Sequence, residues 1–397
     1  MHRSVSFFAV AFVLSFPAVV STACAAPISV GDESQKAFTV PSAQSADSLL
    51  RAGNFATLDE QLSAVQRAYD NRVATDVDLR SAFRAFYTPD SKLMSQYDAW
   101  VAAFPKSYVA RLARGIYYVH VGDLLRGKQL PVDTPDSRWA AASAAFEAAK
   151  SDLEASLPLE QRPLLSVLHL TSIAANQGTL AEKRRLLDAS IAIDPYNYVV
   201  RAAYISAIET RWGGNQQMLK AFIEECRKAK LSRKQMAQLE SVVAEDEGWI
   251  HQFVDHNYAA SEEAYRKSAA LGGDPQLPNL ADVLMKQGKF SAEIQVLTQE
   301  LEQRPKDLDV VANRGYAYMQ VGDLAKSLAD FITAAQAGND YAQNELGVIY
   351  MTGLSGLVQP DPRVAVDWFR KSSAQGNSEA LQNLSKAKAL YPALVPK

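Results

Sequence analysis

The C-terminal third of the sequence repeats with a period of about 34 residues, and this period limits the fold more than any other feature. Residues 279–304 are similar to residues 313–338, so that Gly288 aligns with Gly322 and Leu297 with Phe331. Such a period is typical of helical hairpins that cannot bury their apolar faces alone and therefore stack on one another. Glycine suits the turn inside each hairpin, because it adopts backbone conformations that other residues avoid.

The order of small, aromatic, glycine and apolar positions in these two segments resembles the tetratricopeptide repeat. A looser copy lies at residues 256–275, where Tyr258 and Tyr265 take the packing positions. The resemblance implies pairs of antiparallel helices stacked into a solenoid, with the first helix of each pair lining a concave surface.

The following segment, residues 338–377, has a longer period. Its opening, GNDYAQNEL at residues 338–346, returns as GNSEALQNL at residues 376–384. With Gly347, Tyr350 and Trp368 it resembles the Sel1-like repeat, a close relative of the tetratricopeptide repeat. Ser372 and Ser373 replace that family's paired alanines, which leaves the fold prediction unchanged. Residues 385–397 are expected to form a half-repeat that caps the array.

From Ser45 to about residue 240 the chain also reads as helix, but without a clear period. Apolar residues recur every three to four positions, and the alternation typical of strands is nearly absent. Thr57 with Glu60, and Thr179 with Glu182, have the spacing of a capping box at a helix start. We therefore expect an all-α fold, with an irregular helical domain over 45–240 and a helical-hairpin repeat array over 241–397.

Short patterns in this N-terminal part resemble a bacterial domain of unknown function, number 4034. They are the run WVAAFPKSYVARLARGIYY at residues 100–118, LLRG at 124–127 and RWGG at 211–214. This resemblance implies a domain but no activity.

Residues 1–25 are typical of a secretory signal peptide. A cation at Arg3 precedes an apolar run, and the small residues of ACA at 23–25 form a cleavage site before Ala26. Residues 26–44 have no apolar period and are predicted to be a flexible leader. The chain is thus expected in the periplasm or outside the cell. Lipid anchoring through Cys24 is the less favoured alternative, because Ser21 stands where a lipoprotein signal has an aliphatic residue.

Composition excludes some partners. The chain is 48% apolar and 21% charged, with a net charge of −3, so no basic excess is available to neutralise the phosphates of a nucleic acid. No stretch after the signal peptide is long and apolar enough for a transmembrane segment. Cys226 has no partner for a disulfide in the mature chain, and it is expected to be a buried, unreactive core residue.

The RWGG stretch has two possible interpretations. Glycine after a helix, followed by Asn215 as the N-cap of the next helix, is what a tight helix–helix corner requires. Alternatively, Arg211 could bind an anion while Trp212 stacks on the same ligand. The corner is the favoured interpretation.

Few residues point to catalysis. The sequence lacks the metalloprotease, nucleophile-elbow and phosphate-loop motifs. Glu247, His251 and Asp255 are spaced four apart, so on one helix face they could begin a metal site or simply form ion pairs in solvent. No cofactor is expected, and a metal-dependent hydrolase using these three residues is kept as an alternative.

The expected function is therefore non-catalytic binding of a protein or peptide partner. The register of the repeat places six residues on the concave side of the array, where a partner would contact them: Asp282, Met285, Lys286, Tyr316, Met319 and Gln320. Methionine and tyrosine suit such a surface because one is adaptable and the other amphipathic. Tyr318 is expected to pack between repeats instead. Neutralisation of a cognate toxin remains a further alternative.

Overall fold

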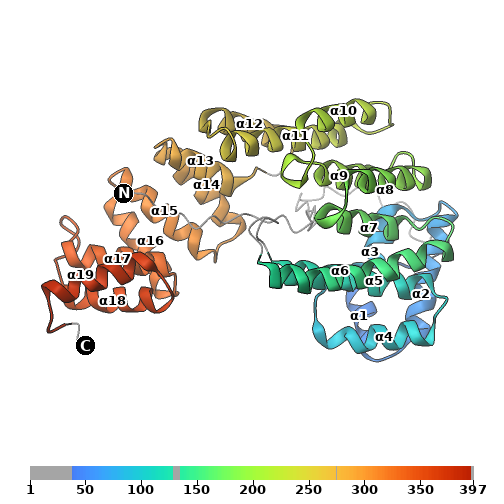
Figure 1. Cartoon of the computed structure of the whole chain (residues 1–397), viewed down its shortest axis with the longest axis horizontal. Helices are drawn as coiled ribbons and strands as arrows, with labels where there is room; N and C mark the ends of the chain where they lie inside the picture. Colours follow the sequence, from blue (N-terminus) through green and yellow to red (C-terminus); the bar gives the residue numbers. More distant parts are fainter. Residues whose placement is uncertain (1–37, 128–134, 274, 395–397) are drawn as a thin grey trace. The chain divides into compact units, whose positions relative to one another are not determined.

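A computed structural model describes residues 38–127, 135–273 and 275–394 (Figure 1). These residues form α-helices joined by turns and short 3-10 segments, and apart from one isolated bridge between Leu354 and Val358 they contain no β-structure. The all-α prediction is confirmed. The predicted signal peptide, Cys24, Ala26 and most of the predicted leader lie outside the described residues.

The chain divides into two compact units, which we call unit 1 (up to Leu239) and unit 2 (from Glu240). The division falls inside one helix, α11 (Arg233–Phe253). The helices of unit 1 that precede it are α1 (Ala43–Arg51), α2 (Phe55–Asp70), α3 (Asp76–Ala82), α4 (Met94–Ala103), α5 (Tyr108–Arg126), α6 (Asp136–Ser156), α7 (Leu164–Gln177), α8 (Leu180–Ile193), α9 (Tyr198–Ala207) and α10 (Gln216–Cys226).

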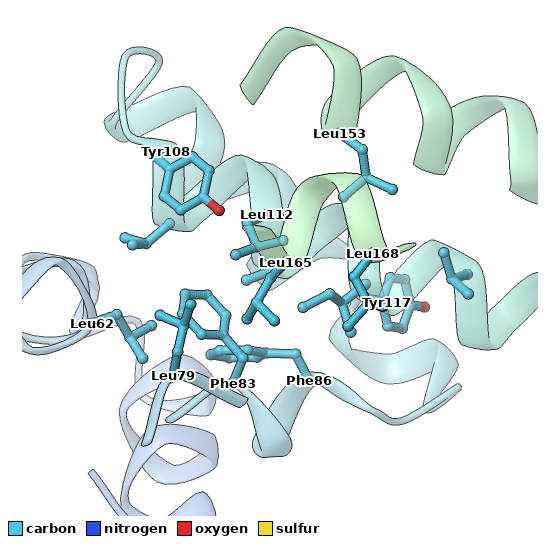
Figure 2. Close-up of a cluster of buried hydrophobic side chains, with 14 of the residues drawn as sticks. Leu62, Leu79, Phe83, Phe86, Tyr108, Leu112, Tyr117, Leu153, Leu165 and Leu168 are labelled. Atoms are coloured by element: carbon cyan, nitrogen blue, oxygen red, sulfur yellow. The ribbon is translucent and has the colours of Figure 1, made fainter. Parts of the chain in front are cut away.

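Unit 1 is built around one large core of aliphatic and aromatic side chains from α1 to α9. Figure 2 shows its centre, where Leu62 of α2 and Leu79 of α3 lie near Phe83 and Phe86 of the turn that follows. Leu165 of α7 points into the same cluster. Because these side chains come from segments far apart in the sequence, they hold an aperiodic set of helices together.

The longest hairpin of unit 1, α5 with α6, depends on two glycines. A Cβ atom at Gly115 would lie 2.7 Å from the Leu153 side chain, and one at Gly122 would lie 2.5 Å from the Phe146 ring. Both partners are fully buried. The absence of a side chain on α5 is therefore what allows α6 to approach so closely.

The predicted helix starts of unit 1 are only partly correct. Thr179 caps α8, since its hydroxyl accepts from the Glu182 N–H at 3.2 Å. The capping box expected at Thr57 is wrong, because α2 begins earlier, at Phe55, and Thr57 lies inside the helix. The leader is also shorter than expected, since Ser42 caps α1 and Phe38 is buried.

Unit 2 continues from the second half of α11 as consecutive helices, each in contact with the next. They are α12 (Tyr258–Ala270), α13 (Leu277–Lys286), α14 (Phe290–Gln303), α15 (Leu308–Gln320), α16 (Leu324–Gln336), α17 (Asp340–Thr352), α18 (Pro362–Ala374) and α19 (Ser378–Leu390). The pairs α13/α14, α15/α16 and α17/α18 are the predicted helical hairpins. The half-repeat predicted at residues 385–397 overlaps only the second half of α19, which begins earlier, at Ser378. The aligned glycines, Gly288 and Gly322, make the turns with φ of 71° and 81°.

Within two of the hairpins, α15/α16 and α17/α18, a glycine of the first helix faces a large side chain of the second. A Cβ atom on Gly315 would lie 3.2 Å from the Phe331 ring, and one on Gly347 would lie 2.5 Å from the Phe369 ring. Both rings are buried. The glycines thus set the spacing of the two helices, as the small positions of the repeat pattern predicted.

Successive hairpins are also linked by asparagines that cap the first helices. Asn339 caps α17 and Asn377 caps α19, each accepting a backbone N–H through its side-chain oxygen. The amide of Asn339 donates to Asp309 Oδ1 at 2.7 Å, and the amide of Asn377 donates to Asp340 Oδ2 at 2.9 Å. The two acceptors lie in the first turns of α15 and α17. Each asparagine therefore caps a first helix and also donates a hydrogen bond to the first helix of the hairpin before it.

The RWGG stretch is a helix–helix corner, as favoured. Gly213 has a left-handed φ of 88°, and Asn215 caps α10 by accepting from the Met218 N–H at 2.9 Å. Arg211 is largely buried and forms an ion pair with Glu209. The alternative use of Arg211 as an anion donor would require breaking this buried pair, which is costly.

A buried lysine of α8 stabilises this corner through two hydrogen bonds. Lys183 of α8 is 2% exposed, and its ammonium donates to the carbonyls of Ala207 and Trp212 at 2.8 and 2.9 Å. These carbonyls lie at the end of α9 and inside the corner. Burial lowers the pKa of Lys183. No sequence pattern indicates this contact, because nothing links α8 to the corner before the chain folds.

Candidate functional site

The six residues predicted to contact a partner lie on two helices of unit 2. Asp282, Met285 and Lys286 belong to α13, whereas Tyr316, Met319 and Gln320 belong to α15. We call the surface on which the sequence register places them, carried by the first helices of the hairpins, the first-helix face. Lys286 and Gln320 are exposed, and the other four are half-buried.

Polar contacts within the array already occupy Asp282. Its Oδ2 accepts from Gln252 Nε2 of α11 at 2.8 Å, and its Oδ1 lies 4.0 Å from the Lys286 ammonium. Gln252 in turn accepts from the buried Tyr265 hydroxyl at 2.7 Å. Asp282 therefore links α13 to α11 and α12, in addition to any role toward a partner.

Tyr316 and Met319 are less open than an exposed strip would be. Both pack against the apolar cluster that contains Phe331, and the Tyr316 ring makes an edge-to-face contact with Phe290, at 6.1 Å between centroids. Tyr318, the expected packing aromatic, is also half-buried. The Arg314 guanidinium and the Lys326 ammonium lie 5.9 and 5.2 Å from its ring centroid. Because both tyrosines are half-buried, the expected division between a surface Tyr316 and a core Tyr318 stays a prediction.

The structure adds a third methionine that the sequence alignment missed. Gly315 of α15 and Gly347 of α17 occupy the same packing position, and a half-buried methionine follows each after four residues. Met285 follows Ala281 of α13 at the same spacing. The three methionines, at one register position of three successive first helices, are Met285, Met319 and Met351. The sequence comparison did not align Met351 with Met319, because the repeat period changes at residue 338.

Glu247, His251 and Asp255 do not share one helix face. Helix α11 ends at Phe253, so Asp255 lies beyond it, where its Oδ2 is 2.8 Å from His251 Nδ1. Across residues 38–127, 135–273 and 275–394, no three histidine, cysteine or carboxylate side chains are grouped so that they could hold a metal ion. The helix therefore ends before the third of these residues, and the contact between His251 and Asp255 is the pairing that the sequence allowed as the other interpretation.

Unit 1 contains a buried polar cluster that no sequence motif predicted. The Tyr87 hydroxyl lies 3.0 Å from His169 Nε2 of α7, and the Tyr87 ring lies 4.9 Å from that of His120 of α5. Burial lowers the pKa of His169 to about 3 and that of His120 to about 4, and raises the pKa of Tyr87 to about 12. All three side chains are therefore neutral near pH 7, which suits a structural cluster better than acid–base catalysis.

Cys226, the cysteine of the described chain, is a core residue as expected. It is buried at the end of α10, one turn after Phe222, whose ring contacts Tyr204 edge to face. Burial raises the pKa of the Cys226 thiol to about 11. A thiol that is both covered and protonated at neutral pH is a poor nucleophile.

Comparison with known proteins agrees with both predicted resemblances. The family described as a domain of unknown function (DUF4034) matches residues 43–181, and the Sel1 repeat matches residues 340–377. The first match includes the Tyr87 cluster and ends before the RWGG stretch, which therefore lies outside it. No curated protein matches the chain.

Among the solved structures that are similar to the chain, we describe one that matches over most of its length. It is a protective antigen present in uropathogenic Escherichia coli strains and displaying an SLR fold. The similarity covers 90% of this chain and 84% of that one, with 18% sequence identity and a TM-score of 0.33. The helical hairpins and the Sel1 repeat together define unit 2 as a helical-repeat scaffold of the kind that mediates protein interactions.

Proposed function

We propose that the chain is an exported, non-catalytic adaptor that binds a protein or peptide on the first-helix face of unit 2. The observation that carries this proposal is the row of Met285, Met319 and Met351. Each side chain is half-buried, so part of each is open to solvent. Thioether side chains adapt to differently shaped apolar partners, and repeat arrays bind along such rows.

Export rests on the signal-peptide pattern of residues 1–25. None of the described helices is both long and apolar enough to cross a membrane. Gln320 and Lys286, both exposed, flank the methionines and could hydrogen-bond to a partner at the edge of the apolar row.

Affinity capture from periplasmic extract, with the mature protein as bait, tests the proposal when variants are compared. Met319→Lys places a charge in the apolar row, and Gln336→Lys places the same charge on an exposed position of α16, a second helix. We expect Met319→Lys to reduce the captured partner about tenfold or more and Gln336→Lys to leave it unchanged.

Thermal unfolding separates binding from stability in the same set. Phe331 is fully buried, so Phe331→Ala should lose about 3–5 kcal/mol and serves as the core reference. Tyr316→Ala should lose clearly less and still weaken capture. Equal capture by the wild type, Met319→Lys and Tyr316→Ala would show that the first-helix face is not the binding surface.

A further inference from the structure

Unit 1 contains a cavity that is separate from the first-helix face. It lies between α6, α7 and the start of α8, and its volume is about 310 Å³. Small-molecule sites in proteins commonly begin at this size. Eight of its nine lining residues lie inside the DUF4034 match, and Glu182 follows that match directly.

The floor of the cavity is aliphatic. It is formed by Leu170, Ile173 and Ala174, which lie along one side of α7 and are 5%, 3% and 3% exposed. Such a floor favours a branched aliphatic group over a polar or charged one, because it offers no hydrogen-bond partner.

The rim carries charges of both signs. Lys150 of α6 lies 3.4 Å from Glu182 of α8, and Gln177 of α7 donates to Glu147 of α6, also at 3.4 Å. Both distances are long for hydrogen bonds, whose usual range ends at about 3.2 Å. A ligand with its own ammonium and carboxylate could therefore make shorter contacts than the rim residues make with each other.

Backbone contacts shape the turn between α7 and α8, which bounds one side of the cavity. A Cβ atom on Gly178 would lie 2.8 Å from the Ala174 backbone, so the turn after α7 closes tightly on the floor. The Thr179 hydroxyl then accepts from the Glu182 N–H and positions Glu182 in the first turn of α8.

We infer that this cavity binds a small aliphatic zwitterion, namely an α-amino acid with a branched apolar side chain. The side chain lies on the α7 floor, the carboxylate pairs with Lys150, and the ammonium pairs with Glu147 and Glu182. The rim bears two carboxylates and one ammonium, so it attracts the ligand's ammonium more strongly than its carboxylate and disfavours a simple anion.

Calorimetric titration of the full mature chain with L-leucine tests this inference. We expect saturable binding with a Kd of about 1 mM or tighter. Isopentylamine lacks the carboxylate, 4-methylpentanoate lacks the ammonium and glycine lacks the aliphatic group, so each should bind at least about tenfold more weakly. Absence of saturable leucine binding, or equal binding of leucine and 4-methylpentanoate, would overturn the inference.

Variants locate the binding. Lys150→Met and Glu147→Gln should each weaken leucine binding about tenfold, whereas Lys220→Met, at an exposed lysine of α10, should not. Ser143→Phe fills the cavity from α6 and should abolish binding. Melting temperatures identify any variant that fails to fold, in which case the remaining variants decide. Leucine binding that survives all three cavity variants lies elsewhere and contradicts the inference.

Discussion

At the scale of single residues, buried polar side chains connect the structure to pH. His169 is 2% exposed and its Nε2 lies beside the Tyr87 hydroxyl, so the imidazole is held neutral. Asp123, a turn after His120, has its pKa raised to about 6 by burial. The two kinds of group act in opposite directions: acid destabilises the fold through the histidines and relieves the penalty on the carboxyl.

Replacing His169 with glutamine isolates the histidine contribution. The pKa of His169 is about 3 in the fold and near 6.5 when unfolded, so the unfolded chain binds a proton first and wild-type stability falls below pH 6.5. The variant lacks this group. Its deficit in unfolding free energy should therefore shrink by about 2–3 kcal/mol between pH 7.5 and 4.5 in urea titrations. A deficit independent of pH would show that His169 is charged or accessible in the fold.

The two glycines of RWGG should respond differently to alanine. Gly213 has a left-handed backbone with open space around it, so Gly213→Ala should cost about 1 kcal/mol through strain alone. At Gly214 a Cβ atom would overlap the Ile208 carbonyl, so Gly214→Ala should cost more. Melting temperatures should fall in the order wild type, Gly213→Ala, Gly214→Ala. A reversed order of the two variants would contradict the corner geometry.

At the scale of elements, the repeat pattern predicted the hairpins of unit 2 well. Gly288, Gly322, Leu297 and Phe331 all occupy the turn or core positions expected of them. Element boundaries in unit 1 were harder, as Thr57 shows. Its spacing to Glu60 is that of a capping box, but Phe55 packs against the unit 1 core and the helix starts there instead. Tertiary packing outweighed a local signal worth about 1 kcal/mol.

The close glycine contacts of the hairpins give a test at this scale. In Gly347→Ala the new methyl group would overlap the Phe369 ring, and we expect a loss of about 1–3 kcal/mol in thermal or urea unfolding. Gly315→Ala has more room beside Phe331 and should lose less. Phe369→Leu added to Gly347→Ala should recover part of the loss; if the two losses simply add, Phe369 does not limit the hairpin spacing.

At the scale of the whole molecule, the two units use different means to stay folded. Unit 1 has one large core with long-range contacts. Unit 2 instead has smaller apolar clusters shared by neighbouring hairpins, and asparagines such as Asn339 hydrogen-bond one hairpin to the next. In an array of the second kind each hairpin depends mainly on its neighbours. Among the described residues no disulfide contributes to stability, because the thiol of Cys226 is free.

Export can be tested on the intact protein. The signal-peptide pattern predicts that the exported chain begins at Ala26, and intact-mass measurement of protein from the periplasm should give the mass of residues 26–397. A diacylglyceryl group on Cys24 would instead show lipid anchoring. Retention of residues 1–25 in the cytoplasm would contradict export.

The sequence by itself determined the helical class, the hairpin periods and the corner at RWGG. Periodicity, glycine and caps act over a few residues and leave a local signal. Tertiary structure alone decided that Tyr316 packs on the core, that Lys183 binds the corner, and that Leu170 and Ile173 line a cavity rimmed by Lys150. These contacts join side chains from helices far apart in the chain, and their energy depends on distances that exist only after the helices have packed.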